Sequence, residues 1–557
     1  MDKRTILAVF LMLAVFWISN EFIWKPKAEA RIAAEKAQMQ TENVSENTQT
    51  TNEIQKVEDS AKLPEQLTNS DIEINNNIEL TTKRDKDNIT YKFTNLGGLL
   101  TDVILSEYFT KDKETEDLTP VNLIPEDGTI FNIVLNQRNG EKLDLSKIVF
   151  ETELSPNNNK LTFTYSTEDG FIRKIYQPSD LAYTLDMNIE MKGFTAVDGY
   201  KIQMDDGIPD TENYLKMKSR DYQVDFQLNN EYNKFTLANL KTLKEINEKQ
   251  KLQEKFILKG KLDWAAIRSK YFIQAIIPER RIEMDAIEAF KNIDTPAANL
   301  EVNVDKDEFH HSYQLYIGPL ISENLQQFSN GIENCVETGP GFLKWLSKIF
   351  LWLFLFIYSL IPSWGLSVII FAILLKTVLY PLTHKSFEST SKMQKINPLM
   401  KEIQAKYKND PKKMNDELRA LYKEHGVSPM GGCLPMLLQM PILFAIYPIF
   451  RYSINLRQSN FLWLPDLSEP DPFYILPIAM ALFMFIQQKL MAPSYDNVEE
   501  MTEQQKASMQ SQRMMMYMMP LMMLFFFKSL SSGLVLYWTV FSIIGTIQQV
   551  SIKRKFQ

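Results

Sequence analysis

The sequence predicts a polytopic α-helical membrane protein with six spans, a large exported β-sandwich domain and a helical hairpin in the cytoplasm. Long apolar runs occur mainly after residue 340, whereas alternating apolar and polar residues dominate the stretch before it. Charge divides at the same place: residues 25–340 contain 37 Lys or Arg against 54 Asp or Glu, and residues 341–557 contain 22 against 13. An acidic soluble part therefore precedes a basic membrane part.

Residues 1–24 combine a basic start with an apolar run and are expected to form an N-terminal transmembrane anchor. A cleaved signal peptide is the alternative, because "AEA" at 28–30 offers small residues for cleavage. Trp17, Trp24 and Pro26 favour the uncleaved anchor. In both cases the basic end stays in the cytoplasm and the residues that follow are exported.

Residues 25–76 are rich in Asn, Gln, Thr, Glu and Lys and are expected to form a flexible linker. From 77 to 335, stretches such as "ITYKFTN" and "YTLDMNIEMKG" alternate apolar and polar residues between Asn, Asp and Gly turns. This period of two predicts a β-sandwich-like domain, which a helical patch, "LKTLKEINEKQKLQEKF", interrupts.

Residues 340–361 are expected to form an amphipathic helix that lies in the membrane interface. Its uninterrupted apolar part, 349–361, is too short to span a bilayer core comfortably. Lys344 and Lys348 lie one helical turn apart beside tryptophans, a combination typical of interfacial helices.

The other spans are expected at 364–383 and four times within 433–557, where a basic tail ends the chain. The last four run over about 433–451, 472–490, 513–528 and 533–550. Residues 384–430 carry ten Lys or Arg and belong in the cytoplasm by the positive-inside rule, as do both chain ends. Two amphipathic patterns around "NDPKK" predict a helical hairpin in this loop; a merely solvated loop is the alternative.

Lys376 interrupts the apolar run of the span at 364–383, and a charge inside a membrane span marks a functional site by default. Snorkelling to the headgroups is the alternative, but Lys376 lies about two turns before the polar end of the span. The five C-terminal spans contain no Asp or Glu that would neutralise it. Lys376, Tyr380 and Thr383 are spaced to share one helix face.

A second polar stripe follows the last span. Thr539, Ser542, Thr546 and Gln549 recur at helical spacing, and Gln439 adds a polar group to an earlier span. Single polar residues commonly join membrane helices. Two stripes together with a lysine predict the wall of a hydrated cavity.

The sequence offers no reason to expect an enzyme, a metal or another cofactor. The two cysteines and four histidines form no metal-ligand pattern, and G-x-S-x-G, P-loop, H-E-x-x-H and glycine-rich nucleotide fingerprints do not occur. Residues 509–523 contain eight methionines, which suit either varied apolar partners or plain lipid.

Three segments resemble the YidC/Oxa/Alb membrane insertase family: "GVSPMGGCLPMLLQMPILFAIY" (426–447), "LPDLSEPDPFYILPI" (464–478) and "SSGLVLYWTVFSIIGTIQQ" (531–549). The similarity covers nearly all of 340–550. "WAAIRSKYFIQAIIP" (264–278) and "LYIGPL" (315–320) resemble the large periplasmic domain of its Gram-negative members.

The resemblance implies a multi-pass protein of the bacterial inner membrane that inserts and helps to fold inner-membrane proteins, alone or with the Sec translocon. The implied partners are nascent membrane proteins, the Sec translocon, membrane lipids and, through the cytoplasmic hairpin, the ribosome or the signal recognition particle machinery; no nucleic-acid substrate is expected. The family's hydrophilic groove carries a basic residue, usually arginine, whose place Lys376 holds. The charge is kept, but the planar five-donor guanidinium is not.

The expected groove residues are Lys376, Tyr380, Thr383, Gln439, Thr539, Ser542, Thr546 and Gln549, and the expected slide for client segments is Leu437, Met440, Phe525, Phe526 and Phe527. The main alternative is a small-anion transporter or channel that uses Lys376. Intramembrane carboxylates and duplicated halves, which such proteins generally have, are absent from the sequence. A further alternative is an enzyme or carbohydrate-binding activity in the β domain, because the family's periplasmic fold resembles sugar-binding sandwiches.

Overall fold

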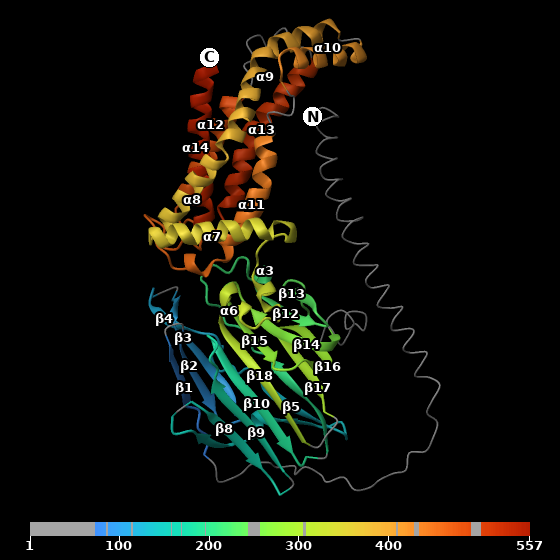
Figure 1. The fold of residues 1–557 in the computed structure, drawn as a ribbon, viewed down its shortest axis with the longest axis vertical. Helices are drawn as coiled ribbons and strands as arrows, with labels where there is room; N and C mark the ends of the chain where they lie inside the picture. The colour runs from blue at the N-terminus through green and yellow to red at the C-terminus, as the bar shows by residue number, and fades with distance from the viewer. Residues whose placement is uncertain are drawn as a thin grey trace, which may run out of the picture. The chain divides into compact units, whose positions relative to one another are not determined.

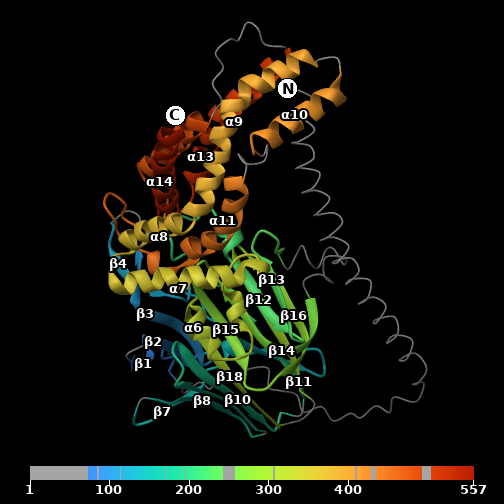
Figure 2. The ribbon, with the colours of Figure 1, turned by 45° about the horizontal axis from the view of Figure 1, so that its top comes forward.

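The computed structural model describes residues 73–556 except 85–86, 113–114, 158, 169, 195, 243–256, 305–307, 408–409, 428–433 and 492–502. The anchor predicted for 1–24, most of the linker predicted for 25–76 and the helical patch from 243 onward lie outside these residues. The described chain divides into a β unit, residues 73–338 with 452–454, and a helical unit, residues 339–451 with 455–556 (Figures 1 and 2).

The β unit contains two antiparallel sheets. The small sheet has the order β1 (Ile78–Arg84), β2 (Asp87–Thr94), β3 (Leu99–Lys111), β4 (Leu118–Asn122). The large sheet has the order β6-β5-β11-β17-β16-β14-β15-β18-β10-β9-β8-β7, and β12 and β13 join it through β14. Its strands are β5 (Asn132–Gln137), β6 (Lys142–Asp144), β7 (Glu151–Leu154), β8 (Leu161–Ser166), β9 (Phe171–Pro178), β10 (Thr184–Lys192), β11 (Val197–Met204), β12 (Gln223–Leu228), β13 (Glu231–Thr236), β14 (Ile257–Arg268), β15 (Phe272–Pro278), β16 (Ile282–Asn292), β17 (Thr295–Asn303) and β18 (Glu308–Pro319). Short helices of this unit are η2 (Leu145–Lys147), α3 (Lys218–Asp221), α6 (Ser322–Gln326) and η3 (Ile332–Cys335).

The alternation in the sequence predicts these strands because one face of each is buried. In β10 the side chains of Leu185, Met187 and Ile189 are buried, and the residues between them are more exposed. In contrast, β15 is buried along its whole length, because it lies between β14 and β18 and is covered on both faces. The prediction of a mostly β-sheet domain is therefore confirmed.

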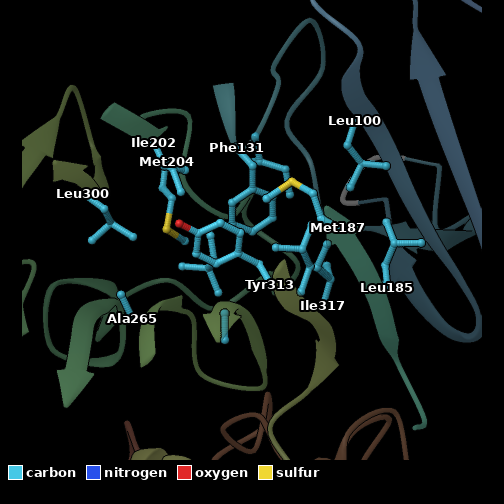
Figure 3. Packing of buried hydrophobic residues seen from close by; sticks show 14 of the residues in the cluster. Leu100, Phe131, Leu185, Met187, Ile202, Met204, Ala265, Leu300, Tyr313 and Ile317 are labelled. Carbon is cyan, nitrogen blue, oxygen red and sulfur yellow. The ribbon is translucent and has the colours of Figure 1, made fainter. Parts of the chain in front are cut away.

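The core of the β unit joins strands that are distant in the chain. Figure 3 shows the side chains of Phe131, Met187, Met204 and Tyr313 pointing toward one another. The hydroxyl of Tyr200 on β11 lies 2.5 Å from that of Tyr313 on β18, although four strands separate β11 from β18 in the sheet. The large sheet is therefore bent so strongly that its own strands face each other across the core.

Two buried side chains of β9 hold the small sheet against the large one. The Lys174 ammonium donates a hydrogen bond to the carbonyl of Gly97 (2.7 Å), and the Tyr176 hydroxyl donates to that of Gly98 (3.1 Å). Both glycines have positive φ, 78° and 55°, and a side chain at either would collide with neighbouring atoms. Burial lowers the pKa of Lys174 to about 7.

Asp205, just after β11, is expected to make the stability of the β unit depend on pH. Burial, followed by the charge of Asp206, raises the pKa of Asp205 to about 6 from 3.8, and Lys201 opposes this shift. The folded state thus binds more protons between these values, and stability is lost as the pH rises through them. Asp205→Asn keeps an oxygen for the Gln203 amide, which donates to Asp205 at 3.0 Å. It should stabilise the unit at pH 7 by about 1–2 kcal/mol, and should give no gain at pH 3.5.

This prediction is checked by urea unfolding of the full chain in detergent, with pulse proteolysis as the readout for the β unit at both pH values. An equal gain at both would show that the carboxylate charge is not the cause.

The helical unit has its own apolar core. Its helices are η4 (Gly341–Leu343), α7 (Lys344–Leu360), α8 (Trp364–Val378), α9 (Tyr380–Lys406), α10 (Pro411–Glu424), α11 (Leu434–Tyr452), η5 (Ile454–Leu456), α12 (Ile475–Met491), α13 (Glu503–Phe527) and α14 (Ser532–Phe556). Among the described residues, two stretches are long and apolar enough to cross a membrane, Gly341–Leu360 and Ser532–Ile552. Shorter apolar helices are Trp364–Val378, Ile475–Leu490 and Met516–Phe527.

Helix α7 runs across the end of the bundle that α8, α11, α13 and α14 form (Figures 1 and 2). Phe350 and Phe354 on one face pack against Phe371 of α8. Trp345 and Trp352 on the opposite face are exposed. One face of the helix thus packs on the core of this unit, and the opposite apolar face is exposed.

The loop between α11 and α12 closes one end of the bundle by hydrogen bonds. The buried carboxylate of Asp471 accepts hydrogen bonds from the Trp463 indole (3.2 Å) and the backbone N–H of Leu476 (2.7 Å). From the turn before α14, the Ser531 hydroxyl donates to the carbonyl of Phe450 and the Ser532 hydroxyl to that of Asp466. Asp471 thereby caps α12 and the loop is fixed on both sides.

Helices α9 and α10 form a pair that extends from the bundle (Figures 1 and 2). They pack through a small apolar cluster that contains Ile396 and Met400 of α9 and Leu421 and Tyr422 of α10. Asp410 caps α10 by accepting a hydrogen bond from the backbone N–H of Lys413 at 3.1 Å.

Candidate functional site

Helix α8 carries Lys376 into the interior of the bundle, where its side chain is only 4% exposed. The helix ends two residues later at Val378, and α9 begins at Tyr380. Pro381 explains the break, because a proline ring clashes with the carbonyl four residues before it and has no N–H to donate.

Three helices meet at the Lys376 ammonium. Its nitrogen lies 3.8 Å from the centre of the Phe541 ring on α14. One turn later on α14, a β-carbon at Gly545 would lie 3.1 Å from that nitrogen and would collide with the amide of Gln487 on α12. Within the described ranges, no carboxylate pairs with Lys376. The positive charge thus lies against an aromatic face, beside the space over Gly545 into which the Gln487 amide also reaches.

The polar stripe predicted on the last span is a buried face of α14. The side chains of Thr539, Ser542, Thr546 and Gln549 are all less than a tenth exposed. Two of them join helices: the Thr539 hydroxyl is 3.2 Å from the carbonyl of Leu476 on α12, and the Thr546 hydroxyl is 3.4 Å from that of Phe483. Part of this stripe therefore connects α14 to α12, as polar residues commonly do in membranes.

The face predicted to join Lys376, Tyr380 and Thr383 crosses the junction between α8 and α9. Thr383 is buried and its hydroxyl bonds back to the carbonyls of Leu379 and Tyr380. Tyr380 is 36% exposed and its ring lies 5.5 Å from the ring of His384. The shared face stays a prediction: Lys376 and Thr383 are both buried, and Tyr380 between them is partly exposed.

Three amide side chains in the bundle each have one buried atom without a hydrogen bond to the described residues. These atoms are Nε2 of Gln439, Oε1 of Gln548 and Oε1 of Gln549. Buried polar atoms are nearly always hydrogen-bonded to protein or to water. These amides therefore indicate a polar interior that needs water or a polar ligand.

The predicted slide is only partly a surface. Met440 on α11 and Phe525 and Phe526 on α13 are exposed, and the side chain of Leu437 lies outside the described residues. Phe527 is 3% exposed and packs on the ring of Trp538 at 5.6 Å, so its assignment to this surface was wrong. The exposed stripe of α13 consists of Met514, Tyr517, Met518, Leu521, Met522, Phe525 and Phe526.

The sequence prediction missed Phe541 and Gly545 as neighbours of Lys376. The available signal was the spacing of Phe541 and Gly545, one turn apart on the face beside the polar stripe. Spacing identifies helix faces but not the helix that each face meets. No cluster of three or more His, Cys, Asp or Glu that could hold a metal occurs in the described part of the chain.

Comparisons with known proteins cover almost the entire described chain. Residues 82–353 match the family model of the YidC periplasmic domain, and residues 356–557 match that of the 60Kd inner membrane protein. The chain is 30% identical to the membrane protein insertase YidC of Chlorobaculum parvum over 508 residues, 84% of this chain and 81% of that relative.

The corresponding protein of Chlorobaculum tepidum is 30% identical over 586 residues, 99% of this chain and 94% of the relative. A crystal structure of an active YidC insertase with its first transmembrane domain resolved shares 18% identity, covers 84% of this chain and 94% of that one, and has a TM-score of 0.34. From the two family models and the relatives, this chain belongs to the YidC family of inner-membrane protein insertases, and its β unit is the periplasmic domain of that family.

Proposed function

We propose that this insertase works through a polar groove between its membrane helices, in which Lys376 is the attracting charge. The observation that carries the proposal is the burial of Lys376 among α8, α12 and α14 with no carboxylate partner among the described residues. An ammonium in such a place has no opposite charge beside it, and the acidic, unfolded outer tail of a client protein supplies that charge.

The proposed topology has six spans: an N-terminal anchor, α8 and α11 to α14, with both chain ends in the cytoplasm. Helix α7 lies in the interface, because it crosses the end of the bundle and keeps Trp345 and Trp352 exposed. The α9–α10 pair is the cytoplasmic hairpin, because ten Lys or Arg lie in 384–430. This places the closed loop around Asp471 on the periplasmic side.

The energy for insertion comes from the client. Moving its apolar segment out of water and into lipid releases about 25 cal/mol per Å² of apolar surface, so no nucleotide is needed. The exposed side chains of α13 and Met440 on α11 offer an apolar path along which that segment leaves the groove. Methionines adapt their shape to different client segments.

The proposed partners follow from this arrangement. Nascent membrane proteins enter alone or from the Sec translocon, the basic hairpin contacts the ribosome or the signal recognition particle machinery, and lipids surround the bundle. Crosslinking from cysteines on α13 and α14 to a stalled nascent single-span protein tests the proposal. If these cysteines never crosslink to the nascent chain, and small anions bind in the groove instead, a transporter would be favoured.

Cysteines in the groove are expected to react with a membrane-impermeant thiol reagent supplied from the cytoplasmic side. The test replaces Cys433, then places single cysteines at Lys376 or Thr546 and labels inverted membrane vesicles. A stalled client should increase labelling of the Thr546 position several-fold, since Thr546 is buried in the closed bundle.

The matched control is a cysteine at Leu534, which lies at the closed end of α14 and should stay unreactive. Unreactive cysteines at both Lys376 and Thr546, in variants that still insert clients, would refute the groove.

A further inference from the structure

We propose that the Phe541 ring is the resting seat of the Lys376 ammonium and that a client carboxylate takes the place of this ring during insertion. The seat is formed by the ring 3.8 Å from the nitrogen, beside the space over Gly545 that the Gln487 amide and the ammonium share. Phe541 and Gly545 are then positioning residues for the charge. The inference rests on the proposed groove and adds which residues hold the Lys376 ammonium while no client is bound.

An aromatic face suits this purpose better than a carboxylate would. A desolvated cation–π contact attracts the ammonium to the negative face of the ring, but more weakly than a buried ion pair does. An Asp or Glu beside Lys376 would neutralise it and compete with every acidic client. The ring keeps the charge buried and still available.

Gly545 provides the room for this seat. Glycine inside a helix is unfavourable compared with alanine, so its presence in α14 calls for a local reason. Here a β-carbon would lie 3.1 Å from the Lys376 nitrogen and would collide with Gln487. The space accepts a compact ammonium, whereas a planar guanidinium with five donors is larger and needs more partners. The seat therefore suits a lysine better than an arginine.

Fluorination of Phe541 tests the seat without changing its shape much. Mono-, di- and trifluorinated phenylalanine at this position weaken the negative face of the ring step by step. An ammonium that loses its seat must be hydrated, so water should reach α14 more often. The readout is the labelling rate of a cysteine at Thr546 in client-free inverted vesicles, in the full chain with Cys433 replaced.

The labelling rate is expected to increase with each fluorine, by about three- to tenfold over the series. In a Lys376→Met background the same series should have no effect. Fluorination of Phe371, a buried ring 6.0 Å from the ring of Phe354 in the same core, is the matched control and should also have none.

The proposed seat would be refuted if the labelling rate did not change with fluorination in the Lys376 protein. An equal increase of the labelling rate in the Lys376→Met protein would refute it as well. Insertion measured in the same vesicles separates this outcome from failure of the groove. If insertion still requires a positive charge at position 376, only the proposal of the seat is refuted. If insertion proceeds without that charge, the proposed function is refuted, whatever the fluorine series shows.

Discussion

Lys376→Glu is expected to reduce the insertion of clients with acidic outer tails at least tenfold, and Lys376→Arg to retain far more activity. Only glutamate inverts the charge that meets the tail. At an effective dielectric constant of about 20, two unit charges about 4 Å apart interact by roughly 4 kcal/mol, so even a third of that value gives a tenfold change. A carboxylate in this place would also meet the negative face of the Phe541 ring on α14.

Lys376→Met is the matched control, because it removes the charge but keeps an unbranched apolar side chain. Its activity should lie between those of the arginine and glutamate variants. Protease protection of a single-span client in vesicles, with equal amounts of each variant, gives the measurement. Equal insertion by Lys376→Glu and Lys376→Arg would exclude an electrostatic role, and a client with a neutral tail should be less sensitive to all three changes.

Arg268→Met is expected to destabilise the β unit by about 3–5 kcal/mol, the largest effect on stability expected in this chain. The Arg268 guanidinium is fully buried, donates from Nε to Asp225 at 2.7 Å and from Nη2 to Glu337 at 3.1 Å. Asp225 is fully buried as well. Removing the arginine leaves a buried carboxylate without its cation, which costs far more than the pair contributes when intact.

The double variant Arg268→Met with Asp225→Leu should recover much of this loss, because it removes both charges together. Pulse proteolysis of the full chain over a urea series measures the stability of the β unit in each variant. Additive losses in the double variant would show that the two side chains do not act as a pair. The single variant should also loosen the segment around Glu337, which Arg268 ties to the sheet.

The secondary structure could be predicted from the sequence because burial of one face of a strand or helix produces a periodic pattern of apolar residues. The alternation in "YTLDMNIEMKG" matches β10, and the apolar run at 472–490 coincides with α12. The bend of the large sheet could not be predicted this way. It depends on which strands meet across the core, such as β11 and β18 through Tyr200 and Tyr313, and their separation in the chain carries no periodic signal.

The candidate site shows the same division. Lys376 was evident as a charge without a counter-ion, and the buried face of Thr539, Ser542, Thr546 and Gln549 followed from helical spacing. The partner of Lys376 was not evident, because an aromatic ring and a glycine look like ordinary residues of a membrane helix. The partial exposure of Tyr380 was not evident either, because α8 and α9 divide a stretch that the spacing treated as one helix.

The hydrogen-bonded end of the bundle affects how well the membrane resists leakage of ions. A protein with a polar interior threatens the ion gradients that a bacterium maintains, because a continuous column of water conducts protons and ions. Asp471 and Ser532 fix the loop over that end through backbone and indole partners. In the proposed groove, water admitted from the opposite end therefore stops partway. An insertase built in this way would pass proteins into the bilayer and preserve the voltage across it.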